Sequence, residues 1–234
     1  MPISGFLLID KPSGWTSFDV VNKVRHIIQD SGLNTTGKKR FPVGHAGTLD
    51  PLATGLLIVM VGDYTKQAES FSKLDKTYQV TARLGETSTT GDEEGEKIRI
   101  SNTEPLNEDI LSTLERFKGE IEQVPPAFSA VKVNGKRAYK LAREGKPVEI
   151  KPRLVKIYDI TDVEYHYPQL SFSVAVSSGT YIRTLVEDIG SLLKTGAYTS
   201  QLRRTSISKY MVSDALAVDK LSSEAIYQNL QTKA

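Results

Sequence analysis

Two kinds of hydrophobic spacing predict strands in this chain. Short runs of consecutive apolar residues indicate strands that are covered on both faces. Runs in which apolar and polar residues alternate are typical of strands with one buried face. In the second kind, Tyr78, Val80, Ala82 and Leu84 share one face, as do Leu170, Phe172, Val174 and Val176. The predicted strands are residues 6–10, 56–61, 76–85, 154–167 and 169–179.

Apolar residues at helical spacing predict four helices. The first follows Thr16 or Ser17, either of which can cap it. Another covers residues 135–144, where Asn134 can cap the start and Gly145 can end the helix. The others cover residues 107–118 and 182–193, and a polar, basic loop is expected over 29–42. The side chains expected to face inward are Val20, Val24, Ile27, Ile28, Ile110, Leu111, Leu114, Phe117, Ile182, Leu185, Ile189 and Leu192.

The order of these elements predicts the fold class. Strands and helices are mixed, and the hairpin-like spacings favour antiparallel pairing, so we expect an α+β fold. We find no repeat and no clear interdomain linker, so residues 1–234 are expected to form a single domain.

Composition limits the possible function. The chain has 234 residues, 39% of them hydrophobic and 25% charged, which is typical of a globular protein. It has no cysteine, which excludes disulfides and cysteine-based metal sites and fits a reducing, cytoplasmic location. The first residues lack the features of a signal peptide, and no stretch is apolar enough to predict a membrane span.

Charge is concentrated in one segment. Residues 127–153 contain eight Lys or Arg and two Asp or Glu, a net charge of +6, while the whole chain carries +2 and the rest therefore −4. This asymmetry is typical of a segment that binds a polyanion, although a solvated surface helix would look similar.

Several motifs resemble known sites but fail in detail. Residues 32–39, "GLNTTGKK", approach a phosphate-binding loop but lack the final Ser or Thr and the preceding strand. Residues 92–95 lack the alternating oxygen ligands of a calcium loop. The three histidines have no partner at metal spacing, and no nucleophilic serine motif is present, so we expect no metal site.

Asp50 is the best candidate for chemistry. It stands in "GHAGTLDP", where Gly44 and Gly47 allow close approach of a ligand and Pro51 stiffens the chain. A turn or cap is the simpler role for such an Asp. A rigid carboxylate can also be a nucleophile, and it then needs a cation nearby. Arg183, placed where a strand turns into a helix, is the expected partner.

An ordered series of motifs resembles the TruB family of tRNA pseudouridine synthases. They are "LLIDKPSGWTS", "GHAGTLDPLATGLL", "KTYQVTARLGETSTTGDEEG", "PPAFSAVKVNGKRAYKLAREG", "SSGTYIRTL" and "LRRTSIS". Together they span about residues 5–210. The resemblance implies a bent, mostly antiparallel mixed sheet flanked by helices, with residues 127–153 as a basic, RNA-gripping insertion.

The resemblance also implies roles for individual residues. Asp50 is the nucleophile, Tyr78 stacks on the target base and exchanges its C5 proton, and Arg183 pairs with Asp50. Leu202 closes the pocket under the base, and His45 contacts RNA. Lys11, with Thr16 and Ser17, belongs to a supporting motif near the site. The expected RNA contacts of the insertion come from Lys132, Lys136, Arg137, Lys140 and Arg143.

The implied reaction converts uridine 55 in the T loop of tRNA to pseudouridine. The C1′–N1 bond breaks, the base turns, and C1′ joins C5, without redox change, so no cofactor or metal is needed. Attack of Asp50 on C1′, attack on C6 and assisted cleavage at C1′ all remain open. The base has to leave the RNA stack, which favours loop nucleotides.

The chain departs from the family pattern in two places. Ser177 and Ser178 stand where some relatives carry a lysine, and about 25 residues follow "LRRTSIS", which is too short for a C-terminal PUA-type domain. We therefore expect a catalytic domain alone, acting as a monomer on the T stem-loop of tRNA, with no membrane partner. An RNA-folding protein and a guide-RNA-dependent rRNA enzyme are alternatives. A phosphatase is disfavoured because no second Asp or magnesium ligand accompanies Asp50.

Overall fold

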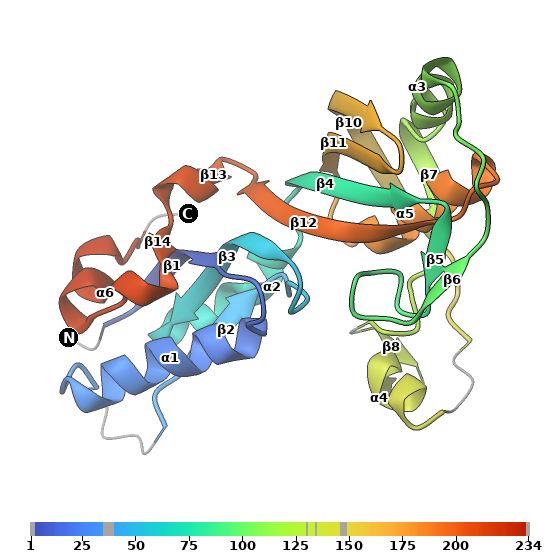
Figure 1. Cartoon of the computed structure of the whole chain (residues 1–234). Coiled ribbons are helices and arrows are strands. Elements are labelled where there is room, and N and C mark those ends of the chain that lie inside the picture. Colours follow the sequence, from blue (N-terminus) through green and yellow to red (C-terminus); the bar gives the residue numbers. More distant parts are fainter. Residues whose placement is uncertain (1–2, 35–39, 130, 134, 146–148, 233–234) are drawn as a thin grey trace. The chain divides into compact units, whose positions relative to one another are not determined.

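The computed structural model describes residues 3–34, 40–129, 131–133, 135–145 and 149–232. It contains two compact units. The first comprises residues 1–78 and 202–234, and the second comprises residues 79–201. Strands β4 and β12 run through both units (Figure 1). The mixture of strands and helices confirms the predicted α+β class.

The elements follow one another in this order. The helices are α1 (Ser17–Asp30), α2 (Ala68–Ser72), α3 (Asn107–Glu115), α4 (Ala138–Arg143), α5 (Ile182–Leu192) and α6 (Ser223–Asn229). The first seven strands are β1 (Gly5–Lys11), β2 (Val43–Ala46), β3 (Thr54–Val61), β4 (Lys76–Leu84), β5 (Glu86–Ser88), β6 (Lys97–Arg99) and β7 (Gly119–Gln123). The others are β8 (Lys132–Val133), β9 (Lys136–Arg137), β10 (Arg153–His166), β11 (Gln169–Val176), β12 (Ala197–Ile207), β13 (Tyr210–Met211) and β14 (Leu216–Ala217). Three short 3-10 turns are η1 (Gly62–Gln67), η2 (Val212–Asp214) and η3 (Val218–Lys220).

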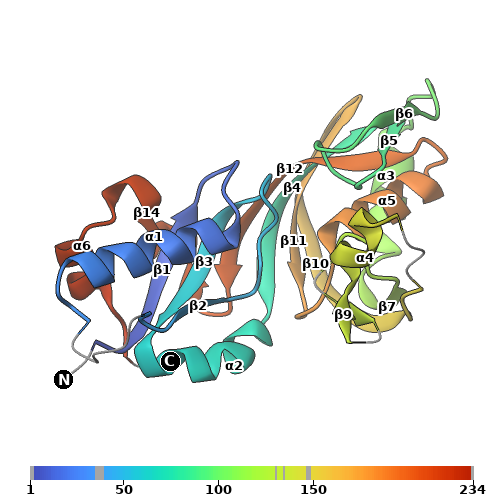
Figure 2. The same ribbon diagram turned by 90° about the horizontal axis from the view of Figure 1, so that it is seen from below.

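In the first unit, the strand order is β14-β1-β3-β12, with β2 also on β3 and β13 also on β12. Strand β1 is antiparallel to β3, whereas β3 and β12 are parallel. Helix α1 packs on β2 and contacts α6 (Figure 2). Nearly every residue of β1 and β3 is buried, as expected for an apolar strand covered on both faces. An aromatic cluster of Phe6, Phe71 and Tyr210 fills part of this core.

In the second unit, the strand order is β12-β4-β11-β10-β7, and β10 is antiparallel to both of its neighbours. The alternating side chains of β4 and β11 face the core as predicted. Helix α5 has a clear apolar face, because Ile182, Leu185 and Ile189 are all buried. The hairpins β5–β6 and β8–β9 are separate from this strand order.

Several predictions of single elements need correction. Leu111 and Leu192 were expected inside, but they are 53% and 43% exposed, because each lies at the edge of its helix's apolar face. Ile27 is only half-buried, and Val21 is buried on that helix instead.

Three boundaries also differ from those expected. The helix expected over 135–144 begins at Ala138, since the residues before it pair in the β8–β9 hairpin. Strand β2 was not predicted, and the helix cap expected at Asn134 lies outside the described residues.

Candidate active site

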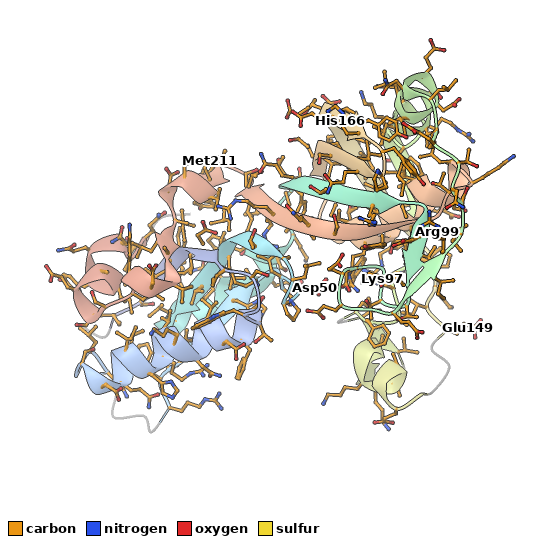
Figure 3. The ribbon with its side chains drawn as sticks, in the orientation of Figure 1. Asp50, Lys97, Arg99, Glu149, His166 and Met211 are labelled. Carbon is orange, nitrogen blue, oxygen red and sulfur yellow. The ribbon has the colours of Figure 1, made fainter. Side chains whose placement is uncertain are left out.

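Asp50 lies in the loop between β2 and β3, in the first unit (Figure 3). Its side chain is half-buried. Its carbonyl accepts a hydrogen bond from the Ala53 amide at 3.1 Å, which closes a tight turn directly before β3. The sequence requires such a turn here, because Pro51 and Pro42 bracket a glycine-rich segment. Asp50 is therefore held on a short, closed loop at the end of a buried strand.

Two buried side chains from the N-terminal segment hold this loop by its main chain. The Lys11 ammonium is fully buried and donates to the carbonyls of Pro12, Trp15 and Pro51, the last at 3.2 Å. The Ser17 hydroxyl donates to the Leu49 carbonyl at 2.9 Å and accepts from the Leu49 amide at 2.8 Å. Both residues that flank Asp50 in sequence are thereby fixed. Lys11 is too deeply buried to reach RNA directly, and its position fits the supporting role.

Thr16 has a different task from its neighbour Ser17. It caps α1, where its hydroxyl accepts from the Asp19 amide and the Asp19 carboxylate accepts from the Thr16 amide. This reciprocal arrangement is a capping box, and it lowers the pKa of the Asp19 carboxyl through those hydrogen bonds. The cap fixes the start of α1 and hence the direction of Ser17, the next residue.

A third buried side chain, Arg204 of β12, holds both ends of the loop. It is 1% exposed, and its guanidinium donates to the Gly47 carbonyl at 2.9 Å and to the Leu56 carbonyl at 2.7 Å. Gly55 has φ of +101°, and a Cβ there would lie 2.2 Å from the Arg204 carbonyl oxygen, so only glycine fits. The sequence analysis did not identify Arg204.

Tyr78 and Leu202 lie on strands next to this loop. Leu202 directly precedes Arg203, which pairs with Thr54 at the start of β3. Tyr78 is 7% exposed on β4, the neighbour of β12, and the Thr205 hydroxyl joins the two strands at the Thr77 carbonyl. Asp50, Tyr78 and Leu202 therefore come from adjacent strands of the first unit or from the loop between two of them.

Lys76 adds a second buried cation to this region. Its ammonium donates to the carbonyls of Ser72 and Leu74. Burial, together with the nearby Arg204 guanidinium, lowers the pKa of Lys76 to about 8, although Asp75 opposes the change. His45 lies on β2, opposite Val59 of β3, and is half-buried.

Arg183 forms the centre of a second cluster, within the second unit. It is the second residue of α5 and 6% exposed. Its guanidinium donates to the carbonyls of Thr90 at 2.9 Å and Phe128 at 3.0 Å, and it lies 3.5 Å from the Asp92 carboxylate. Asp92, which sequence analysis placed in a simple turn, is 4% exposed and also accepts from the Thr90 hydroxyl and the Glu94 amide.

The predicted ion pair between Asp50 and Arg183 joins residues of different units. It stays a prediction, as do the roles of the other site residues. Asp92 is an addition to the expected set, and nothing in its sequence context distinguished it from an ordinary turn residue.

The insertion contributes exposed cations. Lys136 of β9 and Lys140 of α4 are exposed. Lys132, Arg137 and Arg143 are placed on β8, β9 and α4 by their backbone. Gly145 follows α4 with φ of +67°, and its amide donates to the Ala142 carbonyl, so it ends this helix as predicted.

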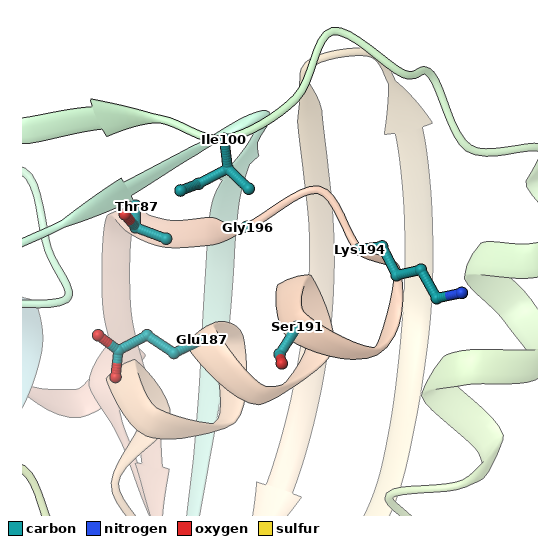
Figure 4. Close-up of a pocket in the computed structure, with 6 residues that line it drawn as sticks. All are labelled: Thr87, Ile100, Glu187, Ser191, Lys194 and Gly196. Carbon is teal, nitrogen blue, oxygen red and sulfur yellow. The ribbon is translucent and has the colours of Figure 1, made fainter.

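A surface pocket of the second unit contains none of the predicted site residues (Figure 4). Burial raises the pKa of the Glu187 carboxyl in it. Its lining residues are Thr87, Ile100, Glu187, Ser191, Lys194 and Gly196. Among the described residues, no three His, Asp or Glu side chains are grouped for a metal ion. Within the same part of the chain, no helix combines the length and apolar composition that a membrane crossing needs.

The fold and the Asp50 loop define a pseudouridylate synthase, and comparison with protein families agrees. The model of the TruB family pseudouridylate synthase N-terminal domain matches residues 35–182, and that of the tRNA pseudouridylate synthase B C-terminal domain matches residues 183–233. The chain belongs to the TruB family of pseudouridylate synthases, which confirms the predicted resemblance.

Curated relatives and solved structures support this assignment. A tRNA pseudouridine synthase B of Haemophilus influenzae (strain PittEE) is 41% identical, over 94% of this chain and 68% of the relative. One of Phocaeicola vulgatus is 45% identical, over 91% of this chain and 89% of the relative.

Among solved structures, a chain of a Cbf5-Nop10-Gar1 complex has a TM-score of 0.70 and 27% identity, over 95% of this chain and 55% of that one. A chain of an H/ACA RNP bound to a substrate RNA has a TM-score of 0.68 and 24% identity, which shows a shared fold. This protein spans about half the length of each of those solved chains.

Proposed function

We propose that this protein is a tRNA pseudouridine synthase that converts uridine 55 in the T loop of tRNA to pseudouridine. Curated relatives at 41–45% identity carry the name tRNA pseudouridine synthase B. The observation that carries the proposal is the Asp50 loop, which three buried side chains, Lys11, Ser17 and Arg204, hold by its main chain. A nucleophile needs such a rigid support, because its position relative to the reacting carbon sets the rate.

In the proposed reaction, Asp50 is the nucleophile and Arg183 its cationic partner. A guanidinium orients a carboxylate through two parallel hydrogen bonds and keeps it ionised. Arg183 is suited to this task because the Thr90 and Phe128 carbonyls already fix two of its nitrogens. Asp92 balances its charge and limits how far the guanidinium can move.

The uridine has to be flipped out of the RNA stack before Asp50 can reach it. Tyr78 supplies a stacking surface for the flipped base and carries the hydroxyl that exchanges the C5 proton, while Leu202 closes the pocket below. Stacking on an aromatic ring contributes roughly 1–3 kcal/mol per base. His45 occupies the space that flipped nucleotides leave in the RNA. The reaction is redox-neutral and needs no cofactor or metal.

The RNA partner is the T stem-loop of tRNA, held by the basic insertion. Exposed cations on this segment suit the phosphate backbone, which supplies most of the affinity in RNA binding. The cations assigned to this contact are Lys132, Lys136, Arg137, Lys140 and Arg143. We propose that the protein acts as a monomer in the cytoplasm, where it also assists tRNA folding by opening and closing the T arm.

A second candidate is an rRNA enzyme that depends on a guide RNA. The likeness to the chain from the Cbf5-Nop10-Gar1 complex favours it. That likeness has 27% sequence identity, however, against 41–45% for the relatives named as tRNA enzymes. The basic insertion within the chain also supports binding of tRNA without a guide.

The test is to incubate the purified protein with unmodified tRNA, with a T stem-loop hairpin and with rRNA fragments, and then to map pseudouridine. We expect modification at position 55 of the two tRNA substrates. Asp50→Asn should abolish it and leave tRNA binding nearly intact, since phosphate contacts dominate affinity. Asp30→Asn, at the exposed end of α1, is the matched control. Residual turnover within about tenfold of wild type would remove Asp50 from the nucleophile role.

A further inference from the structure

One buried amide binds both main-chain groups of a residue near Arg183. Gln123, the last residue of β7, is 1% exposed. Its Nε2 donates to the Tyr181 carbonyl at 3.0 Å, and its Oε1 accepts from the Tyr181 amide at 2.7 Å. Both residues belong to the second unit, and 58 positions separate them in sequence. The amide of a glutamine offers a donor and an acceptor side by side, as this contact requires.

Tyr181 is the residue at which α5 starts. It has an extended backbone, and no side chain caps the helix there. The first amides of a helix have no partner within the helix, so the start of a helix without a cap is easily displaced. Gln123 replaces the missing cap by fixing the residue before the helix. Arg183 follows two residues later, in the first turn.

The segment that carries Gln123 also holds the other end of Arg183. Five residues after Gln123, the Phe128 carbonyl accepts from the Arg183 guanidinium at 3.0 Å. Pro125 and Pro126 lie between these two points and restrict the backbone. Residues 123–128 therefore contact Arg183 through its backbone at one end and through its guanidinium at the other. The same segment continues into the basic insertion.

We propose that Gln123 is a positioning residue for Arg183. It sets the place of the first turn of α5, and thereby the direction in which the guanidinium points. This inference rests on the proposed function, in which Arg183 orients the nucleophile. Displacing a catalytic group by about 1 Å can cost on the order of a hundredfold in rate. Loss of the Gln123 amide should therefore lower kcat while RNA binding is retained.

The test replaces Gln123 with Met, which keeps the length of the side chain but can form neither hydrogen bond. The control is Gln169→Met, at an exposed position of β11 in the same unit. We measure kcat and KM for pseudouridine formation in tRNA, tRNA affinity by filter binding, and the thermal midpoint. For Gln123→Met we expect kcat to fall at least about tenfold, with tRNA affinity within about threefold of wild type. The control should leave all of these unchanged.

A double-mutant cycle distinguishes positioning of Arg183 from general bracing. If Gln123 acts through Arg183, adding Gln123→Met to Arg183→Lys should lower kcat by less than about threefold more. An equal loss in both backgrounds would overturn the proposal, as would a kcat of Gln123→Met within about threefold of wild type.

A second variant covers the case in which Gln123→Met does not fold. Gln123→Glu keeps the size and the acceptor oxygen, but its carboxylate cannot donate to the Tyr181 carbonyl. We again expect a loss in kcat of at least about tenfold, and normal turnover would overturn the proposal. Failure of the proposed function looks different, because the wild-type protein would then form no pseudouridine in tRNA or Arg183→Lys would be fully active.

Discussion

Replacement of Ser17 by Ala tests how the Asp50 loop is held. Ser17 is 2% exposed, and its hydroxyl is both donor and acceptor toward the Leu49 main chain. Alanine removes both hydrogen bonds and leaves the Leu49 amide and carbonyl buried. A buried polar group without its partner costs about 1–3 kcal/mol. Because two groups are involved, we expect the free energy of unfolding to fall by about 2–4 kcal/mol.

The assay is urea denaturation followed by tryptophan fluorescence. The chain has one tryptophan, Trp15, two residues before Ser17, so the signal reports on the first unit. The midpoint of unfolding gives the change in stability, provided that the slope with urea is the same for both proteins. Turnover is measured in parallel, because Leu49 directly precedes Asp50. We expect kcat to fall and tRNA affinity to stay unchanged.

Ser13→Ala is the matched control. Ser13 belongs to the same segment and also bonds a loop carbonyl, that of Leu52, but it is exposed and its bond is longer, at 3.3 Å. Its removal should cost no more than about 0.5 kcal/mol. If Ser17→Ala and Ser13→Ala have the same stability and the same kcat, the reasoning about buried main-chain groups is refuted.

Three further predictions concern charge. Asp92→Asn should lower kcat at least about tenfold with tRNA affinity unchanged, because it removes the carboxylate beside Arg183, and an equal rise in KM would contradict this. Lys76 has its pKa lowered from 10.5 to about 8, so its buried charge destabilises the fold below pH 8 and this cost disappears as the pH approaches 10.5. The stability of wild type relative to Lys76→Met should therefore rise between pH 8 and 10, and a constant difference would show that Lys76 keeps its proton. Neutralising four cations of the insertion should weaken tRNA binding and reduce the slope of its salt dependence by up to about 0.9 for each phosphate that they neutralise, and an unchanged slope would assign them to solvent: Lys136, Arg137, Lys140 and Arg143.

Periodicity predicted the elements whose burial follows a regular repeat. The alternation in β4 and β11 appears unchanged in the structure. Leu111 shows the limit of the method, since it lies at helical spacing but the neighbouring elements leave 53% of it exposed. The apolar stripe of a helix is often wider than the surface that covers it. Strand β2 was missed because four residues containing one glycine give too short a pattern.

The supporting side chains were harder to find because their partners are distant in sequence. Arg204 bonds a carbonyl 148 positions away, and Gln123 bonds one 58 positions away. Neither separation leaves a periodic signal. A local signal did exist for Arg204: consecutive strand residues point to opposite faces, so one of Arg203 and Arg204 had to face the covered side of the sheet. Arg203 instead pairs with Asp10 and is 38% exposed.

Lys11, Ser17, Arg204 and Gln123 have one property in common, which explains how this fold holds its candidate catalytic groups. Each is buried, and each binds main-chain groups. Main-chain anchoring fixes a loop without using its side chains, so those of the loop stay available for the substrate. Burial of a charged or polar group costs free energy unless hydrogen bonds compensate it, whereas an apolar side chain in the same place would pack without that cost. Apolar packing has no direction, however, and a nucleophile has to be held within about 0.5 Å of its working position. Hydrogen bonds supply that direction, and the lower stability that comes with them is therefore a property of the site rather than a defect of the fold.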